Sequence, residues 1–200
     1  MNKTSWYTTD AGMLLLETEK KKLAQVLPNL YGYYLLQVAP SEFTSCITSS
    51  VILNCFNTNT DFIAKDEALP ILNDSIDLIV LNHTLEQSAT GYHPHKILRE
   101  AYRALIPGGH IVITGINPLS YWGCKLFMFD FKTKLVRLST LKDWLSLLDF
   151  ELVPTSVFSC KSFFESIYIV VAVKRVIPLT LVKPIWSTPQ VDWAQGEELS

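Results

Sequence analysis

The chain has 200 residues, a length that favours a single domain with a full hydrophobic core. Hydrophobic residues make up 48% of the chain and charged residues 18%, a balance that excludes an intrinsically disordered protein. The 17 basic and 19 acidic side chains leave a formal net charge of −2, so binding to nucleic acid through bulk charge is not expected. The longest clean apolar run, 167–173, is too short to cross a membrane.

The four cysteines, Cys46, Cys55, Cys124 and Cys160, form no CxxC pair. Near the N-terminus, Glu17 interrupts the apolar stretch and leaves it too short for a secretion signal. We therefore expect a cytoplasmic protein with reduced thiols, no disulfide framework and no metal site.

The first 30 residues predict a helix that ends at Pro28. Glu17 and Glu19 precede lysines 20–22, an order that suits the helix dipole. We interpret the lysine run as a solvated helix face rather than as a nucleic-acid patch.

Apolar runs then predict five strands, which alternate with helical patterns. These strands are expected at 33–39, 51–53, 61–64, 76–81 and 110–114. Nearly continuous apolar strands indicate a parallel sheet that is covered by helices on both faces. The clearest helix precedes the fifth strand, with Pro94 at its start and the turn Pro107-Gly108-Gly109 after its end.

The last third predicts a helix at 140–148 and strands at 151–157 and 166–173. Pro154 suits an edge strand, and the two strands should pair as an antiparallel hairpin. The fold class is therefore α/β: one three-layer Rossmann-like fold of about seven mostly parallel strands. We expect a domain at 1–176, whose residues 1–30 form an N-terminal helical segment, and a C-terminal tail at 177–200 that contains proline and tryptophan.

Two stretches carry a family resemblance, IDLIVLNHTLEQ from residue 76 and HPHKILREAYRALIPGGHIVITGINPLS from residue 93. In order and spacing they closely resemble the type 11 group of class I S-adenosylmethionine-dependent methyltransferases. The resemblance covers residues 30–175 and extends to a small bacterial branch of that group. It implies the methyltransferase fold, S-adenosylmethionine as methyl donor and a small-molecule methyl acceptor.

The cofactor would bind beyond the carboxyl ends of the parallel strands. The residues that the resemblance and these strand ends assign to it are Gln37, Val38, Ala39, Asn54, Lys65, Asp66, Glu67, Asn82 and His83. His83 or Glu86 could also serve as a general base, although each could instead be structural.

The expected glycine-rich cofactor loop is degenerate in this chain. Ala39, Ser41 and Phe43 stand where the family has GxGxG, and Gln37 replaces the acid that precedes this loop. The second strand should end in an acid for the ribose hydroxyls, but only Asn54 or Asn57 is available before the next predicted strand. Neutral hydrogen bonds of this kind are weaker than charge-assisted ones.

The acceptor site is expected over Asn117, Tyr121 and Trp122. The nearby aromatic residues, which suit an apolar or aromatic molecule but could equally pack a lid or the core, are Phe127, Phe129 and Phe131. His93 and His95 could form a metal pair, with helix capping as the plainer alternative.

Three functional hypotheses remain open on the sequence. The first is a methyltransferase that acts on a small molecule. The second is a catalytically inactive methyltransferase-like domain with a binding or regulatory role, which the missing glycines and acids favour. The third is an enzyme of another chemistry on the same sheet. The sequence does not specify an oligomeric state.

Overall fold

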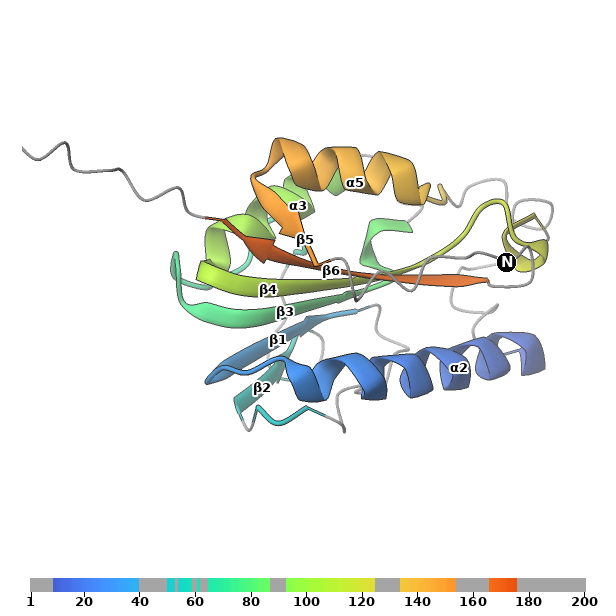
Figure 1. The fold of residues 1–200 in the computed structure, drawn as a ribbon, viewed down its shortest axis with the longest axis horizontal. Coiled ribbons are helices and arrows are strands. Elements are labelled where there is room, and N and C mark those ends of the chain that lie inside the picture. The colour runs from blue at the N-terminus through green and yellow to red at the C-terminus, as the bar shows by residue number, and fades with distance from the viewer. Residues whose placement is uncertain are drawn as a thin grey trace, which may run out of the picture.

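The computed structural model describes residues 9–39, 50–52, 54–58, 61, 65–86, 93–124, 134–153 and 166–175. These residues form one six-stranded sheet in the order β2-β1-β3-β4-β6-β5 (Figure 1). The strands are β1 (Tyr34–Val38), β2 (Asn54–Asn57), β3 (Ile76–Asn82), β4 (Leu105–Ile116), β5 (Phe150–Leu152) and β6 (Ile167–Lys174). The strands β1 to β4 pair in parallel, whereas β6 is antiparallel to both of its neighbours.

Helices cover both faces of this sheet and confirm the predicted three layers (Figure 1). The helix α2 (Asp10–Val26) lies on one face, and α3 (Pro94–Ala104) and α5 (Leu138–Leu147) lie on the other. The helix α2 begins where the Thr9 hydroxyl accepts a hydrogen bond from the Gly12 N–H, at 3.2 Å. It ends as predicted, with Pro28 in the short 3-10 helix η1 (Leu27–Asn29) that follows.

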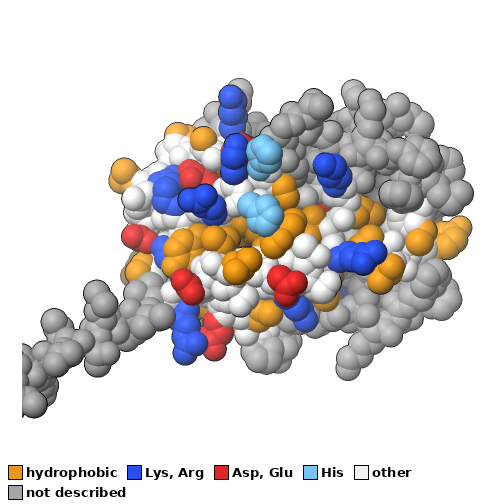
Figure 2. Space-filling view, turned by 90° about the horizontal axis from the view of Figure 1, so that it is seen from above, with side chains coloured by type: hydrophobic (Ala, Val, Ile, Leu, Met, Phe, Trp, Pro, Cys, Tyr) orange, Lys and Arg blue, Asp and Glu red, His pale blue; other side chains and the backbone are white. Residues whose placement is uncertain are grey.

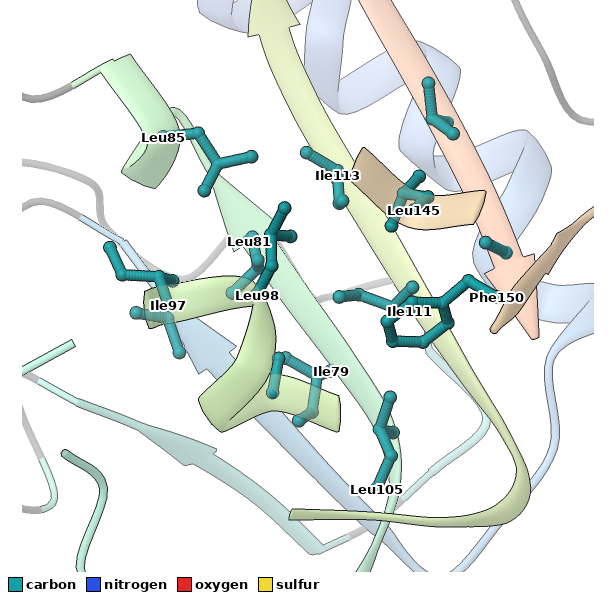
Figure 3. Packing of buried hydrophobic residues seen from close by; sticks show 14 of the residues in the cluster. Ile79, Leu81, Leu85, Ile97, Leu98, Leu105, Ile111, Ile113, Leu145 and Phe150 are labelled. Atoms are coloured by element: carbon teal, nitrogen blue, oxygen red, sulfur yellow. The ribbon is translucent and has the colours of Figure 1, made fainter. Parts of the chain in front are cut away.

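The larger core cluster lies between the sheet and the helices α3 and α5. Figure 3 shows Leu98 of α3 beside Leu81 of β3, and Ile97 of α3 and Ile111 of β4 belong to the same cluster. Ile97 and Leu98 are buried together with Ala101 and Ala104, which lie at helical spacing on the face of α3 that meets the sheet. Figure 2 shows the molecule from the side on which α3 and α5 lie in Figure 1. On this face, basic, acidic and apolar side chains of the described residues are interspersed.

Asp77, near the start of β3, fixes the start of β1. One oxygen of its carboxylate accepts hydrogen bonds from the Tyr33 and Tyr34 N–H groups, at 3.1 and 2.9 Å. A Cβ at Gly32 would collide with the Asp77 side chain, so this close approach requires glycine. The acid near the start of the third described strand is therefore structural and lies away from the carboxyl ends.

Two predicted boundaries were wrong. The second strand is Asn54–Asn57 rather than 51–53, and Asn54 pairs with Tyr34 at the start of β1. In addition, Pro107-Gly108-Gly109 lies inside β4 as an irregularity in its pairing with β3, because the strand already begins at Leu105. Gly108 has a φ of 78° there, in the left-handed region that favours glycine.

The C-terminal antiparallel pair β5–β6 is confirmed, with β5 at the edge of the sheet. Six strands are described, and residues 62–64 of the third predicted strand, 61–64, lie outside the described residues. The tail at 177–200 lies outside them as well. Within the described part of the chain, no helix has the length and apolar character that a membrane span requires.

Candidate functional site

Polar side chains gather where the apolar strands β1, β3 and β4 approach their carboxyl ends. Gln37, Asn82 and Thr114 point to the face that α2 covers, because they continue the alternation of Leu35, Val80 and Val112 in the core on that side. With three further residues they form what we call the buried polar cluster: Glu19, Gln37, Asn82, His83, Glu86 and Thr114. Every member is at most 1% exposed. Such deep burial requires that the polar groups satisfy one another.

One hydrogen-bonded chain in the cluster runs from β1 to α2. The Gln37 Nε2 donates to Asn82 Oδ1 at 2.8 Å, and Asn82 Nδ2 donates to Glu19 Oε1 at 2.9 Å. Asn82 Nδ2 also lies 3.4 Å from the Thr114 hydroxyl on β4. A side chain of the N-terminal helix thereby reaches the carboxyl ends of two parallel strands.

His83 lies between two carboxyl groups. Its Nε2 is 3.0 Å from Glu19 Oε2, and its Nδ1 is 3.0 Å from Glu86 Oε2. Glu86 belongs to the 3-10 helix η2 (Thr84–Glu86), and its other oxygen accepts a hydrogen bond from the Ile116 N–H at the end of β4. The cluster thus ties α2, the end of β3 and the end of β4 together.

The backbone at His83 is unusual and is held from two sides. Its φ of 48° is in the left-handed region, which residues other than glycine rarely adopt. The His83 N–H donates to Thr114 O at 3.2 Å, and the next residue, Thr84, donates its hydroxyl to Val38 O at 2.8 Å. These bonds hold the ring between its two carboxyl partners.

Burial alone would lower the pKa of His83, but the charges of Glu19 and Glu86 outweigh it and raise that pKa to about 10. Burial likewise would raise the pKa of Glu19, but the charge and hydrogen bond of His83 bring it below its ordinary value. At neutral pH the cluster therefore contains a protonated imidazole beside an ionised Glu19. Both ring nitrogens face carboxyl groups, which argues against a general-base role for His83.

Two buried oxygens near these strand ends accept no hydrogen bond from any described residue. They are Gln37 Oε1 and the Thr58 hydroxyl oxygen. Gln37 and Thr58 are neighbours across β1 and β2, because the Thr58 N–H donates to Gln37 O at 3.1 Å. Buried polar atoms are nearly always paired, so two unpaired ones at a sheet edge indicate where a ligand could bind.

Asn54 was expected at the carboxyl end of the second strand, but it lies at the other end of β2. Asn54 lies at the start of this strand, where its Nδ2 donates to Tyr33 O at 3.0 Å, so its expected position at the carboxyl end was wrong. Asn57 is the residue at that end. Its N–H donates to Asp61 Oδ2 at 2.7 Å, which brings an exposed carboxylate to the position where the sequence offered only amides.

Residues 65–67 form a turn closed by the bridge between Lys65 and Ala68. Glu67 faces the start of α3, where its Oε1 accepts from the His93 N–H at 3.1 Å and its Oε2 lies 3.5 Å from Lys96 Nζ. Asp66 is half-buried and Lys65 is exposed. Glu67 thus supports α3, and Asp66 remains the candidate for the cofactor.

The expected acceptor residues follow β4. Asn117 is engaged locally, since its Oδ1 accepts from the Leu119 N–H at 3.1 Å. The Tyr121 and Trp122 rings meet edge to face with their centroids 5.4 Å apart. Trp122 packs against the core beside α2, whereas Tyr121 is 54% exposed. The phenylalanines at 127, 129 and 131 lie outside the described residues, as do Ser41 and Phe43 of the cofactor loop.

The two histidines near α3 are not brought together with further metal ligands in the described part of the chain. The His95 ring packs against the Trp144 ring in a tilted arrangement, with the ring centroids 4.1 Å apart. His93 is the residue before α3, but its side chain makes no capping hydrogen bond.

Sequence reasoning missed Glu19, which it had grouped with the solvated lysine run. The available signal was its place on the apolar stripe of α2, four residues after Leu15 and four before Leu23, both buried. An acid at an inward position of an amphipathic helix must find a buried partner, which here is His83.

Comparisons with known proteins agree with this fold. A family model described as a methyltransferase domain matches residues 34–113. The uncharacterized protein YafS of Escherichia coli (strain K12) is 28% identical over 218 residues, which cover 96% of this chain and 90% of that protein.

Two solved structures are similar in fold at low sequence identity. A S-adenosylmethionine-dependent methyltransferase from Archaeoglobus fulgidus is 19% identical with a TM-score of 0.61, and the match covers 79% of this chain and 94% of that one. A Thermotoga maritima protein described as a possible histamine N-methyltransferase is 14% identical with a TM-score of 0.60, covering 86% and 94%. Residues 34–113 therefore match a methyltransferase-domain model, and the described residues share the fold of these solved S-adenosylmethionine-dependent methyltransferases.

Proposed function

We propose that this chain is an S-adenosylmethionine-dependent methyltransferase that acts on a small-molecule acceptor in the cytoplasm. The observation that carries the proposal is the match over residues 34–113, which spans β1, β2 and β3 with their carboxyl ends and most of β4. In an open parallel sheet these ends form the ligand edge.

The residues at this edge fit the cofactor. Its amino-acid part presents an ammonium group, and its ribose presents hydroxyl groups, all of which donate hydrogen bonds. Gln37 Oε1 and the Thr58 hydroxyl oxygen offer buried acceptors without a described partner. Asp61, at the end of β2, offers the carboxylate that ribose hydroxyls prefer, and Asp66 offers one for the adenine amino group.

Once bound, the cofactor supplies a methyl group on a sulfonium, which transfers by in-line displacement. The work of the protein is then chiefly to position the acceptor and to exclude water. We propose that His83 holds the ends of β3 and β4 together and does not act as a base, because both of its nitrogens face carboxyl groups. Asn117, Tyr121 and Trp122 remain the proposed acceptor side of the site.

A small-molecule acceptor agrees with the description of one similar solved structure, the Thermotoga maritima protein named as a possible histamine N-methyltransferase. The face drawn in Figure 2 also mixes both signs of charge and does not form the uniformly basic surface that a nucleic-acid substrate would favour.

A second candidate function is a methyltransferase-like binding domain without transfer activity. The observation in its favour is the connection between β1 and β2, which has only residues 39–53 for the crossover and no glycine among them. A parallel crossover normally needs at least about a dozen residues and usually holds a helix, so this connection is near the lower limit.

The test is a binding and turnover series on the full chain. We expect Asp61→Asn to weaken S-adenosylhomocysteine binding by roughly tenfold or more, as the loss of a charge-assisted hydrogen bond implies. Asp143→Asn, on the exposed side of α5, is the matched control and should bind like the wild type. If both variants bind S-adenosylhomocysteine with the same affinity, Asp61 does not contact the cofactor.

Turnover separates the two candidate functions. The chain is incubated with S-adenosylmethionine and pooled small amines, phenols and carboxylic acids, and S-adenosylhomocysteine is measured by mass spectrometry. Acceptor-dependent release supports the enzyme. Tight binding with no release from any pool supports the binding domain.

A further inference from the structure

We propose that Glu19 of α2 is a positioning residue, which acts through Asn82 to orient the Gln37 amide so that Gln37 Oε1 is left as the hydrogen-bond acceptor of the ligand edge. The site then selects a ligand group that donates hydrogen bonds, such as an ammonium, over one that only accepts them. The ligand part of this inference rests on the proposed function, whereas the orientation of the amides does not.

The first step is the acceptor character of Glu19. An ionised carboxylate has no hydrogen to donate. Its Oε2 faces His83 Nε2 at 3.0 Å and its Oε1 faces Asn82 at 2.9 Å, so both neighbours must turn donors toward it. For Asn82 this fixes the nitrogen on the side of Glu19 and the oxygen on the opposite side.

The second step passes this polarity to β1. Asn82 Oδ1 can only accept, so the Gln37 atom 2.8 Å away must be the donor Nε2. The remaining amide atom of Gln37 is its Oε1, which is buried and accepts no hydrogen bond from the described residues. If Asn82 turned over, Gln37 would turn with it, and a buried donor would replace the acceptor.

The third step is the anchoring of Glu19 itself. His83 links Glu19 to Glu86, and Glu86 accepts from the Ile116 N–H of β4. All the groups in this path are at most 1% exposed, so water does not compete for their hydrogen bonds. The orientation of the Gln37 amide is therefore set by a helix at the N-terminal end of the chain, outside the matched segment 34–113.

A nuclear magnetic resonance experiment tests the orientation without any ligand. In the wild type, we expect one Gln37 side-chain amide proton to exchange with water far more slowly than those of exposed Gln25. Glu19→Met, which keeps the length of the side chain but accepts no such bond, should accelerate that exchange at least tenfold. Glu19→Gln retains an oxygen for Asn82 and should preserve the slow exchange.

A calorimetric experiment tests the ligand preference with two probes. S-adenosylhomocysteine and 5′-methylthioadenosine share the nucleoside and the thioether, but only the former has the ammonium-bearing end. The measured quantity is the ratio of the affinity for S-adenosylhomocysteine to the affinity for 5′-methylthioadenosine. We expect Glu19→Met and Gln37→Met each to lower this ratio roughly tenfold or more, as the loss of one hydrogen bond to a charged group implies. Glu19→Gln should retain the ratio, and exposed Glu17→Gln is the matched control.

The outcomes separate this inference from the proposed function. A variant that is merely less stable would weaken both probes equally and leave the ratio unchanged, which would overturn the ligand preference. Fast exchange of both Gln37 amide protons in the wild type would overturn the orientation even if no variant folds. Slow exchange together with no binding of either probe at millimolar concentration would uphold the orientation, overturn the ligand preference and contradict the proposed function.

Discussion

The stability of this fold should decrease as the pH rises from about 6.5 to about 10, because His83 must then lose its proton inside the fold. The ordinary pKa of a histidine is 6.5, and the carboxyl groups of Glu19 and Glu86 raise that of His83 to about 10. A group whose pKa is raised by folding stabilises the fold fully below its unfolded value, and this stabilisation is lost up to its folded value.

The magnitude is large for a single side chain. Each pKa unit corresponds to about 1.4 kcal/mol, so a shift from 6.5 to about 10 gives on the order of 5 kcal/mol. His83 is fully buried, so solvent does not screen its partners. Total stabilities are about 5–15 kcal/mol, so this loss would be visible in any denaturation curve.

The assay is urea unfolding at pH 6.5, 8 and 10, followed by circular dichroism, on the wild type and on His83→Asn. Asparagine accepts the left-handed backbone at this position, where φ is 48°, and does not titrate. Only residue 83 differs between the two proteins, so the difference between their two curves isolates the contribution of His83. Parallel curves from pH 6.5 to 10 would refute the reasoning.

On the acid side, the lowered pKa of Glu19 predicts a further loss of stability as the pH falls below about 4.5.

Three further predictions concern packing and buried polar contacts. Leu98→Ala, at a fully buried position of α3, should destabilise the fold by about 2–5 kcal/mol in urea unfolding. Gly115→Ala should destabilise it by about 1–3 kcal/mol, because the new Cβ would collide with the Tyr168 ring, and much less in a Tyr168→Leu background. Lys174→Met should cost about 1–3 kcal/mol, because Lys174 Nζ donates to the carbonyls of Tyr102 and Leu105, at 2.9 and 2.7 Å.

Each of these has an outcome that contradicts it. A change below about 0.5 kcal/mol for Leu98→Ala would be the effect of a surface substitution. Equal effects of Gly115→Ala with and without Tyr168 would mean that the two residues do not clash. If Lys174→Met is no worse than Lys20→Met on the exposed side of α2, the buried contacts of Lys174 contribute nothing.

Apolar patterning predicted most of the fold. The strands β1, β3 and β6 are buried on both faces and appear in the sequence as nearly continuous apolar runs. The second strand escaped this reasoning because its NCFN sequence is half-exposed, whereas the more apolar Val51 and Ile52 precede it. Strand pairing with β1, and not hydrophobicity, determines where β2 begins.

The site was predicted in part. The polar residues near the carboxyl ends of β1 and β3 do lie together, since Gln37 and Asn82 are in direct contact. The roles of Glu19 and Asp61 could not be obtained in the same way, because each depends on a long-range or turn contact that the local pattern does not encode. For Glu19, the one sequence signal was its position on the apolar face of a predicted helix, which indicates a buried acid with a polar partner.

The most direct test of the account is calorimetric titration of the full chain with S-adenosylhomocysteine, supported by melting curves in millimolar ligand. We predict saturable binding and a higher melting temperature, since a ligand at 100 times its Kd adds about 2.7 kcal/mol of stability. Neither heat nor a shift at millimolar ligand would contradict the claim that the ends of β1, β2 and β3 hold the cofactor.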